Sequence, residues 1–260
     1  MTSLRLVILD SNMVTYTENE LINLLHKFAC YLTGYSSLDP AYHDGKFVSE
    51  RRYYGNDWPK HAITMIGVNR LMNIQKLLFD TIKNNVPGHF IETGVWRGGA
   101  CIFAVAIFKL LKITDKNVYV CDSFEGLPKP DPSYTVDNND THYTFKELAV
   151  SLEEVENNFR IFGLLDDQVK FVKGWFCDTL PSLTTTFSVI RLDGDMYGST
   201  MDSLNNLYHK LSYGGYCIID DYMLKGAKLA VDDFRSQHNI QNPLNFIDTH
   251  SQAVYWQKTN

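Results

Sequence analysis

Aspartates follow two apolar segments in the second half of the chain. Asp193 ends the run FSVIRLD, with Asp195 two positions later, and Asp220 ends the run GYCIID beside Asp221. The interval between the two runs has room for one crossover helix, which would return the chain to the same edge of a parallel sheet. Carboxylates gathered at one edge repel one another unless a cation or a shared proton compensates, and oxygen-only ligand sets favour a hard ion. The pattern therefore predicts a Mg²⁺ site, and the lack of His or Cys beside the acids argues against zinc.

A second interpretation of these aspartates is structural. One acid of each pair could cap a helix or form an ion pair with Arg191, Lys225 or Lys228, and neither use needs a metal. The spacing alone leaves both interpretations open.

A glycine-rich segment, FIETGVWRGGA, follows an apolar run near the middle of the chain. Glycines at the turn between a strand and a helix let a ligand approach the backbone closely. The spacing from Gly94 to the pair Gly98–Gly99 differs from the G-x-G-x-x-G of dinucleotide sites, and the preceding Glu92 would repel a phosphate. We therefore expect Glu92 to contact an amino or hydroxyl group of a ligand, although a tight turn without a ligand is the alternative.

Asp122 ends the next apolar run, VYVCD. An acid at the end of a second strand typically accepts hydrogen bonds from both ribose hydroxyls of a nucleoside. The alternative is that Asp122 caps the turn that it begins with Ser123. Together with the glycine turn, this acid points to a nucleoside ligand without phosphates, which favours S-adenosylmethionine over NAD.

Two further segments give weaker signals. Gly174, Trp175 and Phe176 follow a short apolar run and could flank an adenine ring, although an aromatic residue after a strand is as often part of the core. His142 lies in a long polar segment and could serve a substrate hydroxyl, although histidines in loops are usually solvated.

These residues must be positioned by alternating strands and helices, which from residue 88 onward predict a doubly wound α/β fold. We expect a mostly parallel, Rossmann-like sheet of seven strands with helices on both faces, the last two strands forming an antiparallel hairpin. The expected strands are residues 89–93, 117–122, 169–173, 187–193, 215–220, 244–248 and 252–256, and the expected helices are 98–112, 144–159, 199–211 (capped by Ser199) and 225–238.

The first 87 residues differ from the rest. Segments 19–32 and 69–82 have helical periodicity, and the polar, aromatic-rich segment 36–59 separates them. We expect residues 1–87 to form a helical region or lid on a core of residues 88–260 that binds S-adenosylmethionine, within one structural domain. Residues 128–143 hold three prolines and no apolar period, so they should form a long loop of functional interest.

Composition narrows the class of partner. The 260-residue chain has a net charge of -6 and no dense run of Lys or Arg, which argues against nucleic acid or an anionic membrane as a partner. No apolar run approaches the roughly 18 residues that a membrane span needs, and the first apolar run breaks at Asp10 without a cleavage site. Five scattered cysteines suit reduced thiols. We expect a cytoplasmic protein that binds a small molecule; a homo-oligomer stays open.

Several long segments resemble the macrocin O-methyltransferase family, whose members methylate sugar hydroxyls on macrolide and aminocoumarin antibiotics. The matching segments are GNDWPKHAITMIGVNRL, ETGVWRGG, DSFEGLP, GWFCDTLP and RLDGDMYGSTMDSLNNLYHKLSYGGYCIIDDY, so the likeness covers roughly residues 50–256. The resemblance implies a class I methyltransferase sheet, S-adenosylmethionine as the methyl donor, a metal ion bound by the clustered aspartates, and an N-terminal lid.

The resemblance also assigns roles to single positions. It implies donor contacts at the glycine turn and at its flanking segments, metal ligation by the acids at the two strand ends, and a choice between ligand and general base for Asp195. Trp96 stands where the commoner methyltransferase motif has a glycine, which matches this family. The implied donor contacts are Thr64, Met65, Glu92, Thr93, Gly94, Trp96, Asp122, Ser123, Gly174 and Trp175, and the implied metal ligands are Asp193, Asp220 and Asp221.

The expected reaction needs an acceptor hydroxyl held in line with the donor methyl group, at about 3 Å. A divalent ion lowers the pKa of such a hydroxyl, and a nearby carboxylate then accepts the proton. Asp193, Asp195 and His142 are the catalytic candidates. Two alternatives are an NAD(P)-dependent reductase on a similar sheet and a non-catalytic, methyltransferase-like binding subunit.

Overall fold

Seven strands form one mostly parallel sheet in this computed structural model, which describes residues 16–250 and 253–259. The strand order is β3-β2-β1-β4-β5-β7-β6. Strands β1 to β5 run parallel, and β7 pairs antiparallel with both β5 and β6. The strands are β1 His89–Thr93, β2 Val118–Asp122, β3 Val169–Lys173, β4 Phe187–Leu192, β5 Leu211–Ile219, β6 Asn245–Phe246 and β7 Val254–Gln257. The predicted fold class is confirmed, including the final hairpin; position 252 of the last predicted strand lies outside the described residues.

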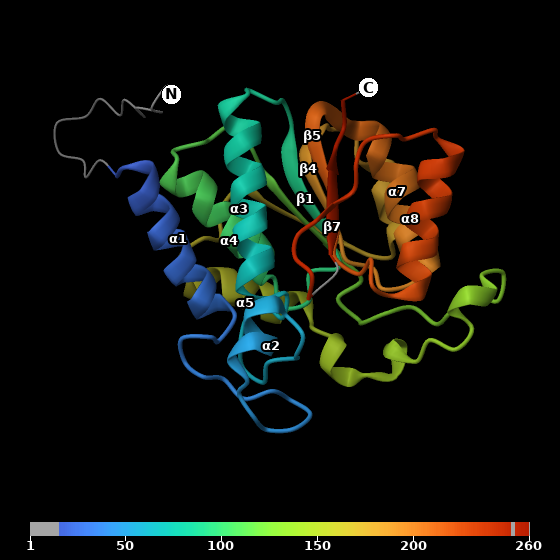
Figure 1. Ribbon diagram of the computed structural model, residues 1–260, viewed down its shortest axis with the longest axis horizontal. Helices are drawn as coiled ribbons and strands as arrows, with labels where there is room; N and C mark the ends of the chain where they lie inside the picture. The colour runs from blue at the N-terminus through green and yellow to red at the C-terminus, as the bar shows by residue number, and fades with distance from the viewer. Residues whose placement is uncertain (1–15, 251–252, 260) are drawn as a thin grey trace.

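Helices cover both faces of the sheet (Figure 1). One layer contains α1, α3 and α4, and the other contains α7 and α8. The alternation of side chains along β1 explains the division, because Phe90 packs in the cluster with α3 and α4 whereas Ile91 packs in the cluster with α7 and α8. The α-helices are α1 Glu18–Leu32, α2 Ser49–Tyr54, α3 Gly67–Lys83, α4 Gly99–Leu110, α5 Leu152–Ile161, α6 Phe176–Thr179, α7 Tyr197–Leu207 and α8 Lys225–Gln237.

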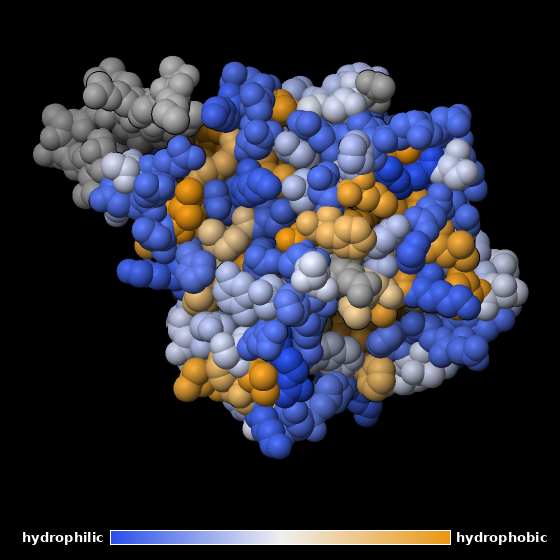
Figure 2. Space-filling view, viewed as in Figure 1, coloured by the Kyte–Doolittle hydropathy of each residue, from blue (hydrophilic) through white to orange (hydrophobic). Residues whose placement is uncertain are grey.

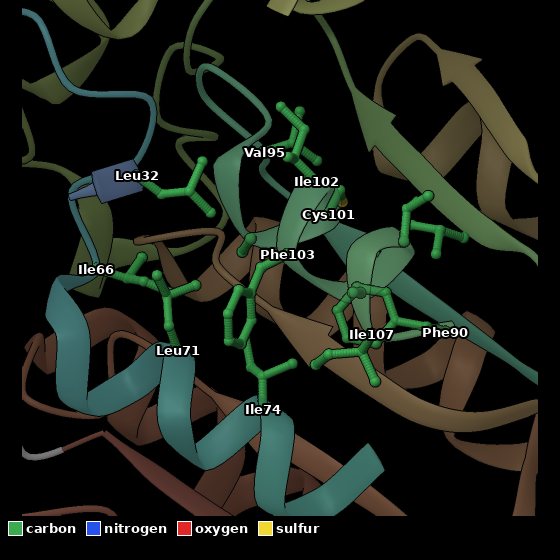
Figure 3. Close-up of a cluster of buried hydrophobic side chains, with 14 of the residues drawn as sticks. Leu32, Ile66, Leu71, Ile74, Phe90, Val95, Cys101, Ile102, Phe103 and Ile107 are labelled. Atoms are coloured by element: carbon green, nitrogen blue, oxygen red, sulfur yellow. The ribbon is translucent and has the colours of Figure 1, made fainter. Parts of the chain in front are cut away.

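The N-terminal helices belong to the main core. Ile74 of α3 lies against Phe103 of α4 beside the sheet (Figure 3), and Leu25 of α1 is buried in the same cluster. Burial of this apolar surface on one sheet face is what holds α1 and α3 in place. The described part of the N-terminal region therefore supplies a structural layer, while positions 1–15 of that predicted region lie outside the described residues.

Two predicted helices differ clearly from the structure. The helix expected at 199–211 is α7, Tyr197–Leu207, and a 3-10 turn at Tyr208–Lys210 separates it from β5; the helix expected from residue 144 starts only at Leu152. Ser151 explains the second difference, because its side chain accepts a hydrogen bond from the Glu154 amide and so caps the helix at that point. Helix α2 had not been predicted, because six residues with the sequence SERRYY carry no apolar period.

Two segments lie over the carboxyl ends of the parallel strands, and we call them the cover: residues 41–66, which include α2, and residues 128–148. Both are at the lower end of the molecule in Figure 1. The second segment contains only short 3-10 turns, Thr135–Asp137, His142–Thr144 and Lys146–Leu148, as expected for a long loop. The buried Arg52 supports the first segment, because its guanidinium donates to both carboxylate oxygens of Asp57 (2.8 and 3.1 Å).

Within the described part of the chain, no helix is both long and apolar enough to span a bilayer. On the face shown in Figure 2, hydrophobic residues lie in small groups among hydrophilic ones, which is ordinary for a folded domain in water.

Candidate active site

Four aspartates meet at the carboxyl ends of β4 and β5, and we call them the carboxylate edge: Asp193, Asp195, Asp220 and Asp221. The pairing of Leu192 with Ile219 in register places the residues after both strands side by side. Oxygen atoms of Asp193, Asp220 and Asp221 all lie within 4.8 Å of one another. Such a compact set of carboxylate oxygens fits a hard divalent cation.

Charge repulsion at this edge is large. Burial, together with the neighbouring Asp193, Asp195 and Asp220 carboxylates, raises the pKa of Asp221 well above its ordinary value. A cation at this point would remove that repulsion and favour the ionised form. The residues present therefore fit the predicted Mg²⁺ ion in both chemistry and charge.

Two arginines already neutralise part of the edge. The guanidinium of the buried Arg191 forms ion pairs with Glu92 and Asp220, and it donates to Asp193 Oδ2 at 2.8 Å. Arg70 of α3 pairs with the other oxygen of Asp220. Each Asp220 oxygen thus has an arginine partner, so the structural interpretation left open above applies to Asp220. Asp221 has no such arginine contact among the described residues, and Asp193 has one.

Asp195 differs from its neighbours in backbone and in environment. It has a left-handed backbone, with φ of 58°, which reverses the chain after Gly194 and turns the side chain into the cavity. Its amide donates to Asp221 Oδ2 at 3.0 Å. Burial and the adjacent Asp193 raise the pKa of Asp195 to about 7, while His142 acts in the opposite direction. A carboxylate with a pKa near neutrality is suited to accept a proton.

The glycine turn after β1 lies directly against the carboxylate edge. Gly94 has φ of 83°, and a Cβ there would overlap the carbonyl oxygen of Asp193, so only glycine fits. Asp122 closes the turn, since its carboxylate accepts from the amides of Val95 and Phe124, both at 2.8 Å. Asp122 therefore connects the turn after β1 with the turn after β2. It caps the turn that it begins, as the structural alternative predicts, and it also lines the cavity.

Glu92 is buried and already partnered. One oxygen pairs with Arg191, and the other accepts a hydrogen bond from the Cys101 thiol at 2.8 Å. Burial raises the pKa of Glu92 to about 7, although Arg191 opposes the shift. This residue thus supports Arg191 at the same time as it forms part of the cavity wall.

One cavity of about 540 Å³ joins these groups, a size suited to a small-molecule site. Its wall contains most of the predicted residues. They are Thr64, Met65, Glu92, Gly94, Trp96, Asp122, Ser123, His142, Trp175, Asp193, Asp195, Asp220 and Asp221.

Thr93 and Gly174, two of the predicted donor contacts, are not brought to the cavity wall. The buried Thr93 hydroxyl accepts a hydrogen bond from Ser203 of α7 at 3.2 Å, because alternation along β1 points it to the opposite face of the sheet from Glu92. Gly174 donates its amide to the Asp122 carbonyl at 2.9 Å. Both residues therefore hydrogen-bond to other residues and do not line the cavity.

The cover closes the cavity through a few side-chain contacts. Trp58, on the cavity wall, packs edge-on against Phe145, with ring centroids 5.6 Å apart. The Tyr42 hydroxyl lies close enough to the Glu147 carboxylate to lower the pKa of that carboxyl, and Trp96 donates its indole N–H to the Glu147 carbonyl at 2.8 Å. The two cover segments therefore meet each other and the glycine turn.

His142 is fixed within the cover. Its Nδ1 lies 2.9 Å from Asp140 Oδ2, and its amide donates to Asp140 Oδ1 at 2.8 Å. The ring lines the cavity close enough to Asp195 to influence the pKa of that carboxyl. This geometry makes His142 a candidate for contact with an acceptor, beside Asp195.

The wall residues that sequence reasoning missed include Trp58, Arg70, Tyr134 and Asp137. Arg70 lies in an amphipathic helix, where a basic residue normally faces solvent, and its pairing with Asp220 spans 150 positions. Tyr134 and Asp137 belong to the predicted loop, and the aromatic and acidic residues among its prolines were the only available signal.

Residues 2–258 match the family model described as Macrocin-O-methyltransferase (TylF). The chain is 48% identical over 223 residues to a demethyldecarbamoylnovobiocin O-methyltransferase from Streptomyces niveus, covering 84% of both proteins. It is 44% identical over 221 residues to a mycinamicin III 3''-O-methyltransferase from Micromonospora griseorubida, covering 83% of this chain and 86% of that protein. The solved structure of the O-methyltransferase NovP matches with a TM-score of 0.88 and 47% identity, over 92% of this chain and 99% of that one. The calicheamicin methyltransferase CalS11, at 17% identity, shares the fold with a TM-score of 0.60, over 94% of both chains.

Proposed function

This chain belongs to the macrocin O-methyltransferase family, and from that premise we propose that it methylates a sugar hydroxyl of a small secondary metabolite, with Mg²⁺ at the carboxylate edge. Family membership makes it an O-methyltransferase, so the reductase and the non-catalytic subunit are no longer alternatives. The observation that carries the proposal is that the carboxylate edge and the glycine turn face one cavity.

The donor site is proposed at the glycine turn and its neighbours. S-adenosylmethionine supplies a methyl carbon activated by a sulfonium. Asp122 and Ser123 at the end of β2 would hold the ribose, and Trp175 after β3 would lie against the adenine. Thr64 and Met65, which line the same cavity, would contact the remainder of the donor.

The acceptor hydroxyl would lie between the donor site and the carboxylate edge. A divalent cation bound there supplies Lewis-acid polarisation of the acceptor oxygen. Asp193 and Asp221 are the ligands with the most free oxygen positions, whereas Asp220 supports the site through its arginine pairs. Asp195 would take the acceptor proton, because its side chain faces the cavity and its pKa is close to neutrality.

The family-specific part of the proposal is tested by binding and by turnover. Titration calorimetry with S-adenosylhomocysteine and with NADH should show binding of the first alone. Methyl transfer should be assayed with mycinamicin III and demethyldecarbamoylnovobiocin, the acceptors in the names of two relatives. We expect EDTA to stop turnover and Mg²⁺ to restore it. Full turnover in EDTA would refute the metal and leave base catalysis alone.

The division between ligand and base has its own test. Asp193→Asn should shift the Mg²⁺ dependence of the rate to higher concentration, because a ligand charge is lost. Asp195→Asn should lower the rate with little change in that dependence. Equal shifts in both variants would show that Asp195 is also a ligand, and the opposite pattern would reverse the two roles.

A further inference from the structure

Asp137 is only 3% exposed, although most of the loop that contains it, residues 128–143, is exposed. Its carboxylate accepts hydrogen bonds from the amides of Tyr197 (2.9 Å) and Gly198 (3.1 Å), the first two residues of α7. The N-cap residue of that helix, Met196, provides no side-chain cap. A carboxylate at this end of a helix satisfies free amides and favours the helix dipole. The loop thus caps α7 from 60 positions earlier in the chain.

The surroundings of Asp137 are closely fitted to it. A Cβ at Gly226, near the start of α8, would lie 2.6 Å from Asp137 Oδ1. A Cβ at Gly198 would lie 3.1 Å from the ring of Tyr134, and that ring packs against Tyr197 with centroids 5.0 Å apart. The loop is therefore seated between the first turns of α7 and α8, in a space that two glycines leave open.

This contact leads directly to the residues of the cavity. The Asp140 amide donates to the Asp137 carbonyl at 2.8 Å, and Asp140 in turn holds both the amide and the ring of His142. Helix α7 begins two positions after Asp195. The Asp137 contact therefore fixes the position of His142 and Tyr134 relative to Asp195, across the part of the cavity where the acceptor must lie.

We propose that Asp137 is a positioning residue for the acceptor: it fixes residues 128–143 to α7 and so holds Tyr134 and His142 as the wall opposite Asp195. This proposal depends on the proposed function for one point only, namely that the acceptor is a hydroxylated ring. Loss of the contact should release this wall and leave the donor site and the carboxylate edge unchanged, because Asp137 contacts neither.

The first test needs no ligand. Hydrogen exchange followed by mass spectrometry should be compared among the wild type, Asp137→Ala, Asp137→Asn and Asn139→Ala. Asn139 is an exposed loop residue off the cavity wall and serves as the matched control. We expect Asp137→Ala to increase exchange at residues 197–198 and 128–143, and Asp137→Asn, which keeps one acceptor oxygen, to give a smaller increase. If the alanine variant does not fold, the asparagine variant provides the same comparison.

The second test separates positioning from general stability. In Asp137→Ala the KM for the acceptor should rise about tenfold, as expected for loss of hydrogen bonds to a charged group, and Asp137→Asn should recover part of this loss. The affinity for S-adenosylhomocysteine should stay within about twofold, because the donor site keeps its contacts. Unchanged exchange in a folded Asp137→Ala, or released exchange with an unchanged acceptor KM, would overturn the proposal. If the wild type methylates neither test acceptor, the proposed substrate class fails, while the exchange experiment still decides the role of Asp137.

Discussion

The carboxylate edge and the cover line one cavity but are held in different ways. At the edge, strand backbone fixes the side chains, and a fully buried arginine pairs with three acids. In the cover, the contacts between the two segments involve exposed side chains such as Tyr42 and Phe145. Two relatives, 48% and 44% identical to this chain over the matched residues, are named for different acceptors. On the proposed function, we expect the chemistry to belong to the carboxylate edge and the choice of acceptor to belong to the cover.

The largest effect is expected for the proposed base. Asp195→Asn should lower the catalytic rate by a factor of about 10²–10⁴, the usual contribution of general base catalysis. The binding of S-adenosylhomocysteine should not change, because Asp195 does not belong to the donor turn. Rate measurements at saturating acceptor test this. A variant that keeps most of its rate would show that Asp195 is not the base and would weaken the comparison.

Removal of the central arginine should have the largest effect on stability. Arg191→Met leaves Glu92, Asp193 and Asp220 without their shared buried partner, and breaking such a pair costs about 3–5 kcal/mol in the free energy of unfolding. Urea denaturation measures this value. The control is Arg51→Met, which removes an ion pair between exposed side chains and should leave the free energy of unfolding almost unchanged. Similar losses in both variants would mean that the edge is no more tightly held than the cover.

The donor side should be affected less. In Asp122→Ala the affinity for S-adenosylhomocysteine should fall about ten- to a hundredfold, through loss of charge-assisted hydrogen bonds. Because Asp122 also accepts from the amides of Val95 and Phe124, part of the loss should come from a looser turn. Asp122→Asn separates the two contributions, since it keeps one acceptor oxygen. Unchanged affinity in a folded Asp122→Ala would remove this residue from the donor site.

The raised pKa of Asp195 gives a prediction for pH. Its folded-state pKa of about 7 exceeds the ordinary value of 3.8, so between these values the folded state binds more protons than the unfolded state. The contribution of Asp195 to the free energy of unfolding therefore falls as pH rises from about 4 to about 7. In EDTA, the free energy of unfolding of Asp195→Asn should be compared with that of the wild type at about pH 5 and at about pH 8. The difference should change in favour of the variant at the higher pH, by more than the roughly 1.4 kcal/mol that one pKa unit represents. Urea midpoints at the two pH values measure it, and parallel changes in both proteins would contradict it.

The smallest effect is expected within the cover. Tyr42→Phe removes the hydroxyl beside the Glu147 carboxylate but keeps the ring. Tyr42 is exposed, so the acceptor KM should rise by only about two- to threefold, with no change in the maximal rate. Steady-state kinetics with the acceptor that the wild type methylates provide the measurement. A fall in the rate at saturating acceptor would show that the cover takes part in the chemistry.

The parts of the molecule that follow from local sequence were the predictable ones. Apolar runs that end in an acid located β1, β2, β4 and β5, and the parallel arrangement then brought Asp193, Asp220 and Asp221 together, because strands in such a sheet end at one edge. The likeness to a known family added the methyl donor. Seven strands, their mostly parallel order and the final hairpin were all obtained in this way.

Contacts between distant segments were not predictable. Ser199 was expected to cap α7, yet the cap is Asp137, and no local pattern indicates a carboxylate supplied by a loop so far away in the chain. Arg70 likewise meets Asp220 only because α3 packs on the sheet. Thr93 was assigned to the donor from its position in the motif, although side-chain alternation along β1 points it to the other face.

The close approach of Gly94 to the Asp193 carbonyl has a consequence for how such an enzyme can change over time. The backbone of the glycine turn and that of the carboxylate edge are in direct contact. With donor and acceptor bound as proposed, the separation between the methyl donor and the receiving oxygen would be set by main chain and would be the same for every acceptor. Selection for a new acceptor can then act on the cover without disturbing that separation. In a library selected for altered acceptor use, accepted substitutions should concentrate in residues 41–66 and 128–148, and Gly94 should remain invariant.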